Sequence, residues 1–300
     1  MPSATQMRTS SPEQAQGILF LLLAIFLFTL MDATAKYLGQ YYPVPQVIWA
    51  RYIGNLVVVA LYFRASFLPS LRSRRPGVQF GRALAQLASA ALFFTSLQYI
   101  GIAEATAIMD INPVLITLGA GLFLGEQIGW RRILGIVAAL VGAMIIIRPG
   151  LGVFHPAAIL PLIGAFTYAA GALLTRMART DTLATSVVWS VLVGSIATSL
   201  LVPFFWQPVQ MDHLWAFVII GLLGAASQAL IVHAFSLSEA GAIAPFGYTS
   251  LIWAALWGWL FWGVLPDRWT VTGAVIIVIA GLYIWSRENR TARKEVPRHE

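Results

Sequence analysis

Four ionisable residues lie well inside long apolar stretches of the chain: Asp32, Lys36, Arg51 and Asp110. A charge near the centre of a bilayer costs about 2.5–3.5 kcal/mol on insertion scales, so such residues normally face a bundle interior and have partners. Asp32 and Lys36 are four residues apart and share one helical face, where they can pair. At a rise of about 1.5 Å per residue, Arg51 and Asp110 lie about 9–10 Å from the outer membrane surface. We expect all four in one layer of the outer half of the membrane.

This charged layer has two interpretations. The residues can form buried ion pairs, Asp32 with Lys36 and Arg51 with Asp110, that only fix the packing of the helices. They can instead contact a solute. Neither interpretation is favoured for Asp32 and Lys36. Solute contact is favoured for the other pair, because apolar replacements of buried ion pairs are often no less stable.

Aromatic residues occupy the related positions in the second half of the chain. At an offset of 138 residues, the positions of Arg51 and Asp110 correspond to Trp189 and Tyr248, and Trp253 lies near the same layer. A further aromatic residue of that layer is Tyr168. The hypothesis is a solute whose charged or zwitterionic end meets the two charges while its planar part meets the aromatic faces. The alternative is that these rings face lipid or pack between helices.

Helix-breaking residues recur at corresponding places in the two halves. Asn112 and Pro113 lie inside one apolar stretch, and Pro245 and Gly247 lie inside another. Proline removes a helical hydrogen bond and kinks the helix, and broken helices in transporters form binding sites or hinges. Ordinary kinks that only shape the bundle are an equal alternative.

His233 is the remaining candidate for chemistry inside an apolar stretch. With an unperturbed pKa of about 6.5, a histidine can relay protons, although a lone histidine near a helix end more often serves as hydrogen-bonded scaffolding. The chain has no cysteine. It also lacks the His-Glu-x-x-His, Gly-x-Ser-x-Gly and Gly-x-x-x-x-Gly-Lys patterns. We therefore expect no enzyme, no ATP hydrolysis, no cofactor and no metal.

The composition requires a bilayer. Hydrophobic residues make up 59% of the 300 residues and charged residues only 10%, whereas charged residues approach a quarter of soluble domains. The 11 Trp residues fall mostly near the ends of apolar runs, as in the aromatic belts of membrane proteins. The net charge of +7 is spread over the connections, which argues against nucleic acid as a partner.

Ten apolar runs are long enough to span a hydrocarbon core of about 30 Å, and they predict a closely packed α-helical bundle. Their ranges are 17–37, 45–63, 82–100, 103–124, 131–147, 157–175, 182–202, 214–235, 240–262 and 269–286. With the N-terminus in the cytoplasm, most of the 19 Lys and Arg residues, Arg82 among them, lie inside. The positive-inside rule therefore places both termini in the cytoplasm.

The two halves of the chain repeat each other. Gly125-Glu126-Gln127-Ile128-Gly129 and Gly263-Val264-Leu265-Pro266-Asp267 are 138 residues apart, and each is followed by tryptophan and arginine. Each half holds five spans, and an odd number inverts the second half relative to the first, as in many secondary transporters. The expected organisation is a tail (1–16), a first repeat (17–149), a second repeat (150–286) and a basic tail (287–300).

Residues 17–286 resemble the EamA family of the drug/metabolite transporter superfamily. The similarity is carried by Met31-Asp32-Ala33-Thr34-Ala35-Lys36-Tyr37, Trp49-Ala50-Arg51-Tyr52, Glu104-Ala105-Thr106-Ala107, Asn112-Pro113, Leu124-Gly125-Glu126, Trp130-Arg131-Arg132, Ala244-Pro245-Phe246-Gly247-Tyr248 and Phe261-Trp262-Gly263-Val264-Leu265-Pro266-Asp267. Val264 departs from the pattern, because the second repeat often has Glu there.

The resemblance implies an all-α polytopic membrane protein with ten transmembrane helices in two inverted five-helix repeats. It further implies a secondary transporter in the inner membrane that works by alternating access. The favoured function is export of an amino-acid-like or zwitterionic metabolite, such as an amino-acid derivative or an opine-type metallophore. The alternatives are an importer of a solute such as riboflavin or S-adenosylmethionine, and a channel or non-transporting scaffold subunit. The expected partners are a small solute and the bilayer, and a homodimer is left open.

Overall fold

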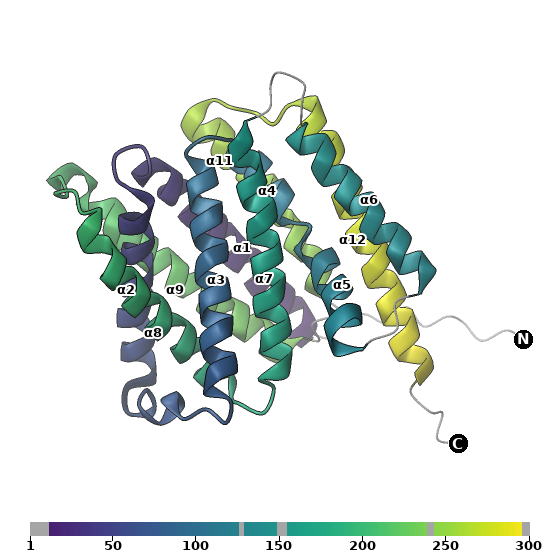
Figure 1. The fold of residues 1–300 in the computed structure, drawn as a ribbon, viewed down its shortest axis with the longest axis horizontal. Coiled ribbons are helices and arrows are strands. Elements are labelled where there is room, and N and C mark those ends of the chain that lie inside the picture. The colour runs from purple at the N-terminus through teal and green to yellow at the C-terminus, as the bar shows by residue number, and fades with distance from the viewer. Residues whose placement is uncertain (1–11, 126–128, 149–154, 239–242, 296–300) are drawn as a thin grey trace, which may run out of the picture.

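The computed structural model describes residues 12–125, 129–148, 155–238 and 243–295. These residues form an all-helical bundle (Figure 1). The principal helices are α1 (Pro12–Leu38), α2 (Val44–Phe63), α3 (Pro76–Leu97), α4 (Ile102–Met109), α5 (Asn112–Leu124), α6 (Trp130–Ile147), α7 (Ile159–Met177), α8 (Leu183–Leu201), α9 (Leu214–Leu237), α11 (Ser250–Trp262) and α12 (Arg268–Glu295). Outside the described residues lie parts of the predicted tails, residues 126–128 of the repeated motif, the connection at 149–154 and the start of the predicted span 240–262.

Eight helical segments of the described chain are long and apolar enough to cross a membrane. One of them, Ile102–Phe123, contains the interruption between α4 and α5. The apolar part of α6 is shorter, at Ile133–Ile147, and α11 follows a six-residue 3-10 helix, η6 (Ala244–Thr249). The fold is therefore helical as predicted, while the number ten remains a prediction.

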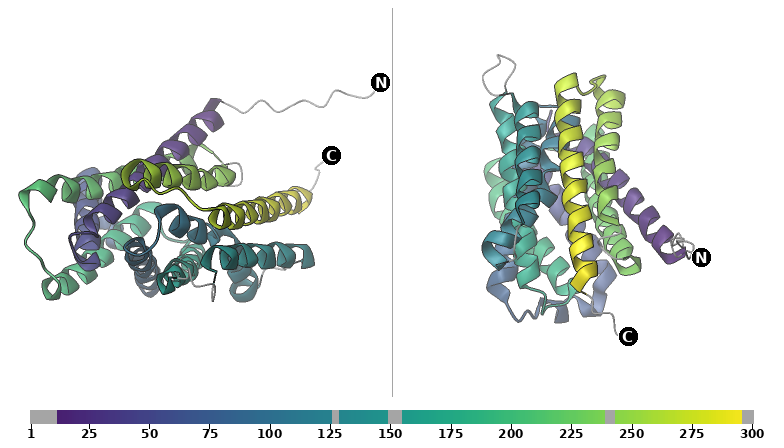
Figure 2. Two further views of the ribbon diagram at one scale, coloured as in Figure 1. Left: turned by 90° about the horizontal axis from the view of Figure 1, so that it is seen from above. Right: turned by 90° about the vertical axis from the view of Figure 1, so that its right-hand side faces the viewer.

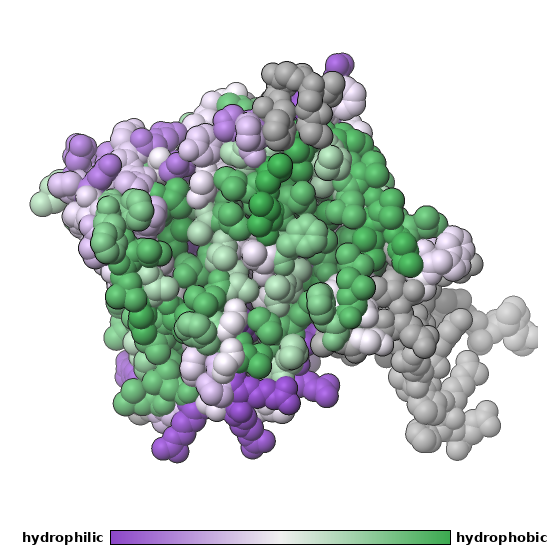
Figure 3. All heavy atoms as spheres, in the orientation of Figure 1, coloured by the Kyte–Doolittle hydropathy of each residue, from purple (hydrophilic) through white to green (hydrophobic). Residues whose placement is uncertain are grey.

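The exterior of the bundle is apolar. In Figure 3 a broad band of hydrophobic side chains covers the middle of the visible face, and hydrophilic side chains gather at its two ends. Large side chains such as Leu19, Leu61, Phe123 and Ile279 are more than half exposed. Because apolar surface in water is unfavourable, this band fits the hydrocarbon of a membrane.

Corresponding helices of the two halves end in the same way. Gly125 ends α5 with φ 73°, and Gly263 ends α11 with φ 66°. This left-handed conformation is open to glycine without a steric penalty and commonly terminates helices. The two glycines are the corresponding residues of the repeated motif, so the repeat seen in the sequence is also a repeat of local backbone structure.

Helices α6 and α12 run antiparallel and lie side by side (Figures 1 and 2). A Cβ on Gly135, near the start of α6, would meet Ile284 near the end of the apolar part of α12. A Cβ on Gly273, near the start of α12, would meet Ile146 at the end of α6. Glycines on both helices let the two backbones approach closely.

Helices α2 and α8 also run antiparallel. Trp49 Nε1 donates to Ser199 Oγ at 3.0 Å, and Ser195 Oγ donates to the Tyr52 carbonyl oxygen at 3.1 Å. Residue numbers thus rise along α2 as they fall along α8. The early part of α2 packs beside the late part of α8.

Helices α2 and α9 touch backbone to backbone. A Cβ added to Gly54 would lie 2.4 Å from the Cα of Gly221. We expect Gly54→Ala to destabilise the protein by about 1–3 kcal/mol, because the helices must separate. The measurement is the melting temperature in detergent. Gly77→Ala in α3 is the control, since its added Cβ meets nothing within 4 Å, and an equal loss in both variants would contradict the tight contact.

Candidate functional site

Helices α1 and α2 bring three polar side chains together inside the bundle: Asp32, Arg51 and Asn55, here called the α1–α2 polar cluster. Asp32 is buried and interacts electrostatically with Arg51. Arg51 and Asn55 are one helical turn apart on α2. Asp32 Oδ1, Arg51 Nε and Asn55 Oδ1 are all buried without a hydrogen-bond partner. An unpaired buried polar atom is unfavourable by about 1–3 kcal/mol. These three atoms can therefore each accept a hydrogen bond from a further group or donate one to it.

Aromatic rings surround the charge of the α1–α2 polar cluster. The Arg51 guanidinium carbon lies 5.3 Å from the centre of the Phe94 ring, 5.5 Å from that of Phe28 and 5.9 Å from that of Tyr52. Cations are attracted to aromatic faces at such distances. The rings come from α1, α2 and α3, so three helices enclose the guanidinium.

Lys36 does not pair with Asp32, so the ion-pair interpretation does not apply to these two residues. Its ammonium instead donates to the Leu97 carbonyl oxygen at 2.5 Å and to the Ile100 carbonyl oxygen at 2.7 Å, at the end of α3. The last carbonyls of a helix have no partner within the helix, and they attract a cation. Lys36 also faces the Trp262 ring at 5.8 Å and interacts electrostatically with Glu104.

Asp110 lies where the span formed by α4 and α5 is interrupted. Its carboxylate accepts a hydrogen bond from Ser250 Oγ at 2.9 Å, and Ser250 is the first residue of α11. Tyr248, at the end of η6, lies within electrostatic reach of the same carboxylate. The break between α4 and α5 and the break between η6 and α11 therefore meet at Asp110. No ion pair joins it to Arg51 among the described residues, so the less favoured of the two interpretations of this pair does not apply.

Three further polar atoms around this interruption have no partner. They are Thr106 Oγ1, Asn112 Oδ1 and Tyr248 Oη, all buried. Thr106 is one turn before Asp110 on α4, and Asn112 begins α5. Together with Asp110 and Ser250, these residues form what we call the helix-break cluster.

The predicted helix breakers flank this cluster. Pro113 follows Asn112 in the first turn of α5, where a proline is tolerated because the amides there have no helical partner. Pro245 and Gly247 belong to η6, directly before α11. The irregular backbone thus occurs at 110–111 and at 244–249, in corresponding parts of the two halves.

Trp189 does not lie beside Arg51, contrary to the prediction from the repeat offset. Its Nε1 donates to the Leu71 carbonyl oxygen at 3.1 Å, in the segment that connects α2 to α3. The reason is the antiparallel arrangement of α2 and α8. Corresponding residues of these two helices lie toward opposite ends, so equal position in the repeat does not mean equal depth.

The remaining predicted residues have separate surroundings. Trp253 packs edge-on against Phe26 of α1, with ring centres 5.0 Å apart. Tyr168 on α7 is 43% exposed. His233 on α9 is exposed, and its ring lies 4.7 Å from that of Phe20. These three are not among the residues with direct contacts to Asp110 or Arg51.

Arg82 is a buried charge that the sequence prediction placed at the cytoplasmic end of the span 82–100. The structure places it in α3, where it is 4% exposed. It donates to the Ser186 carbonyl oxygen, to Ser190 Oγ at 2.7 Å and to Gln79 Oε1 at 3.0 Å. Pro76 in the first turn of α3 is a helix-start signal. That signal, with polar residues at 79, 82 and 86 on one face, could have revealed the earlier start of α3.

Asp181, in the turn between α7 and α8, joins this region to the connection between α2 and α3. Its carboxylate accepts hydrogen bonds from Ser73 Oγ at 2.5 Å, from the Arg74 backbone N–H at 2.9 Å and from Gln79 Nε2 at 3.0 Å. Partial desolvation opposes ionisation, but these hydrogen bonds and the charge of Arg74 hold the pKa of Asp181 below its usual value.

This depressed pKa predicts a pH dependence. The stabilisation is present above the unfolded-state pKa of about 3.9 and is lost as pH falls through the lower folded-state pKa. We expect the difference in melting temperature between the natural protein and Asp181→Asn to stay constant at neutral pH and to shrink below about pH 4. A constant difference down to pH 3 would show that ionised Asp181 is not the stabilising acceptor.

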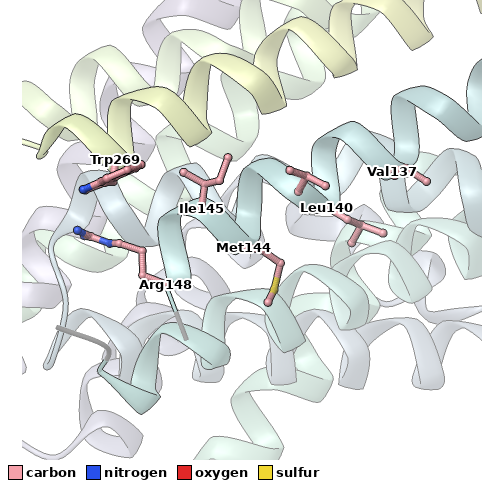
Figure 4. Close-up of a pocket in the computed structure, with 7 residues that line it drawn as sticks. Val137, Leu140, Met144, Ile145, Arg148 and Trp269 are labelled. Atoms are coloured by element: carbon pink, nitrogen blue, oxygen red, sulfur yellow. The ribbon is translucent and has the colours of Figure 1, made fainter. Parts of the chain in front are cut away.

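An apolar groove of about 480 Å³ lies on the exposed flank of α6 (Figure 4). Its lining is Val137, Leu140, Val141, Met144, Ile145, Arg148 and Trp269. Arg148, at one end of the groove, forms an ion pair with Asp267 at 2.7 Å. The groove offers no carboxylate or amide to a polar solute. Among the described residues, moreover, no group of three His, Asp or Glu side chains could hold a metal ion.

A bundle of long apolar helices in two similar halves, with polar atoms left unpaired in its interior, defines a multi-pass helical membrane protein. The chain belongs to the EamA-like transporter family, which matches residues 15–148 and 155–286. This confirms the resemblance inferred from the sequence motifs and the presence of two such repeats.

Curated relatives are transporters of different solutes. The chain is 29% identical over 286 residues to a riboflavin transporter of Vibrio cholerae, with 93% of this chain and 96% of the relative covered. It is 27% identical over 272 residues to the pseudopaline exporter CntI of Pseudomonas aeruginosa, with 88% and 94% covered. It is 25% identical over 281 residues to an S-adenosylmethionine uptake transporter of Rickettsia bellii, with 93% and 97% covered.

A solved crystal structure shares the fold. It superposes with a TM-score of 0.59 at 18% identity, covering 94% of this chain and 99% of the other. The coverage means that the whole helical bundle, rather than one half, is common to the two proteins.

Proposed function

We propose that this protein is a secondary transporter that carries a small organic solute across the inner membrane by alternating access. The observation that carries the proposal is the set of unpartnered buried atoms in the α1–α2 polar cluster and the helix-break cluster. Buried polar groups are normally hydrogen-bonded. A solute or water that enters and leaves the path would supply the missing partners.

The chemistry of the α1–α2 polar cluster favours a zwitterionic solute. The Arg51 guanidinium is a donor suited to a carboxylate, while Asp32 and Asn55 offer oxygen acceptors to an ammonium group. The rings of Phe28, Tyr52 and Phe94 offer apolar faces to the rest of the solute. We propose export of an amino-acid-like metabolite, and the similarity to a pseudopaline exporter supports this direction.

A second candidate is import of a vitamin or nucleoside-like solute that carries a planar ring system, such as riboflavin or S-adenosylmethionine. The aromatic surroundings of Arg51 favour it, because planar rings stack on aromatic faces and on guanidinium groups. The relatives that carry such solutes support it equally. The two candidates share one path and differ in what fills it.

The proposed topology has ten spans in two inverted repeats, at 17–149 and 150–286, with both tails in the cytoplasm. The antiparallel packing of α6 with α12 and of α2 with α8 supports the inversion. In the right-hand view of Figure 2, α1 begins and α12 ends toward the same end of the bundle. A homodimer remains an untested proposal for the assembly.

Counterflow in proteoliposomes tests the function. Vesicles loaded with an unlabelled amino acid, with riboflavin or with S-adenosylmethionine are diluted into the same labelled solute at trace concentration. A carrier concentrates the label transiently and saturably, whereas a channel or a scaffold subunit does not. Overshoot with the amino acid alone supports the solute of the first candidate, and overshoot with riboflavin or S-adenosylmethionine but not with the simple amino acid supports that of the second.

A further inference from the structure

Two sets of polar contacts tie the halves together at opposite ends of the bundle. The first set, here called the α3–α8 latch, consists of Gln79 and Arg82 on α3, Asp181 in the turn before α8, and Ser186 and Ser190 on α8. Arg82 donates to Ser190 Oγ at 2.7 Å, and Gln79 Nε2 bridges Asp181 and Ser186 Oγ at 3.0 and 3.2 Å. These contacts lie beside the connection between α2 and α3, at the bottom of Figure 1.

The second set, here called the α2–loop latch, joins the start of α2 to the connection between α8 and α9. Gln46 Nε2 donates to the Gln207 carbonyl oxygen at 2.9 Å, and the Gln207 N–H donates to Gln46 Oε1 at 3.0 Å. Tyr42 Oη lies 2.9 Å from His213 Nδ1 and accepts from the Gln210 N–H at 3.0 Å. Gln46 is fully buried by these contacts.

The two latches are counterparts in the repeated structure. The α3–α8 latch joins the segment after α2 to the start of α8. The α2–loop latch joins the segment after α8 to the start of α2. The correspondence is one of segments and not of residues, because Gln79 and Arg82 correspond at the offset of 138 to Phe217 and Ile220 on α9. Because α2 and α8 run antiparallel, the latches close opposite ends of the same seam.

The contacts of the α3–α8 latch suit repeated opening. The hydrogen-bond acceptors of Arg82 are neutral oxygens of Gln79, Gln86, Ser186 and Ser190 rather than a carboxylate. Water can replace such acceptors, and the net contribution of a hydrogen bond made by a charged group is about 1.5–3 kcal/mol. The Arg82 guanidinium therefore keeps these hydrogen bonds while α3 and α8 are packed together. Water can solvate it once the two helices separate.

We propose that the two latches are the gates of the solute path, and that Arg82 holds one gate closed while Gln46 holds the other. Both gates are closed in this structure, which is therefore an occluded state. Transport requires that one latch opens while its counterpart stays closed. This inference rests on the proposed transport function, but its test does not need the solute.

The natural absence of cysteine allows a direct accessibility test. Asn55→Cys places one thiol in the α1–α2 polar cluster, and a membrane-impermeant maleimide is added to sealed vesicles of either orientation. We expect Arg82→Gln to accelerate labelling at least about fivefold from the side of the α3–α8 latch only. We expect Gln46→Ala to accelerate it from the opposite side only, and Arg82→Lys to restore part of the closure.

Two further variants make the test decisive. Arg72→Gln removes an exposed charge from the connection between α2 and α3 and is expected to leave labelling unchanged. Ser190→Ala removes a single contact of Arg82, and it replaces Arg82→Gln should that variant fail to fold. Equal acceleration from both sides, or none with folded protein, overturns the gate assignment. A side-specific change combined with absent counterflow would retain the gates and reject the proposed solutes.

Discussion

Arg51→Gln is expected to lower the rate of solute counterflow by more than about tenfold while the protein still folds and inserts. The reason is that Arg51 holds the only cationic group of the α1–α2 polar cluster, and its Nε has no protein partner to lose. A lost charged contact with a bound carboxylate removes about 1.5–3 kcal/mol of binding, which is a factor of roughly ten to a hundred.

Two comparisons make this result specific. Asp32→Asn keeps the shape of the cluster but removes its negative charge, so an ammonium-bearing solute should lose affinity by a similar factor. Asp212→Asn changes an exposed carboxylate in the connection before α9 and should have no effect. Normal counterflow in both cluster variants, at matched protein levels, would exclude the α1–α2 polar cluster as the solute site.

Tyr248→Phe is expected to lower transport about tenfold without lowering the melting temperature. The Tyr248 hydroxyl is buried without a partner, so its removal relieves an unpaired group and should leave stability unchanged or raise it. Thr106→Val should behave in the same way, because valine keeps the shape of threonine and deletes a second unpartnered oxygen. Stability and activity would then move apart, as expected for groups retained for function.

Asp110→Asn is the reference for the effects of Tyr248→Phe and Thr106→Val on stability and transport. The carboxylate accepts a hydrogen bond from Ser250 at 2.9 Å, so this substitution disturbs a formed contact and can lower both stability and transport. If Tyr248→Phe and Thr106→Val instead lower the melting temperature and leave counterflow intact, the helix-break cluster is structural.

Apolar patterning predicted the helical class, and the motifs predicted the family, because both depend on features that are local in the chain. A bilayer demands long apolar runs, and the two glycine-ended motifs at Gly125 and Gly263 are contiguous in sequence. These features do not require knowledge of which helices are neighbours.

Partners between helices could not be predicted in the same way. Spacing shows that Asp32 and Lys36 share a helical face, but it does not show that the unpaired carbonyls of Leu97 and Ile100 lie nearer to the ammonium. Trp189 was placed beside Arg51 because their positions in the repeats correspond. In an antiparallel pair of helices that correspondence reverses depth, which becomes apparent only from contacts such as Trp49 with Ser199.

Depth was also misjudged where a charge lies within a helix. Arg82 was predicted as the first residue of the span 82–100 and was grouped with the cytoplasmic charges Arg72, Arg74 and Arg75. The structure shows that α3 begins at Pro76 and carries Arg82 into the seam against α8. Burial there depends on neutral acceptors from another part of the chain, and no pattern in the local sequence identifies them.

The bare contact between Gly54 and Gly221 has a mechanical consequence. Because no side chain separates the two backbones, we expect this crossing to act as a pivot about which α2 can tilt as a rigid body. When α2 tilts, its two ends move in opposite directions. Tyr42 and Gln46 at one end therefore move opposite to the segment that follows Phe63 at the other end. Pivoting of one rigid helix about a single narrow contact can thereby prevent both ends of the solute path from opening at the same time.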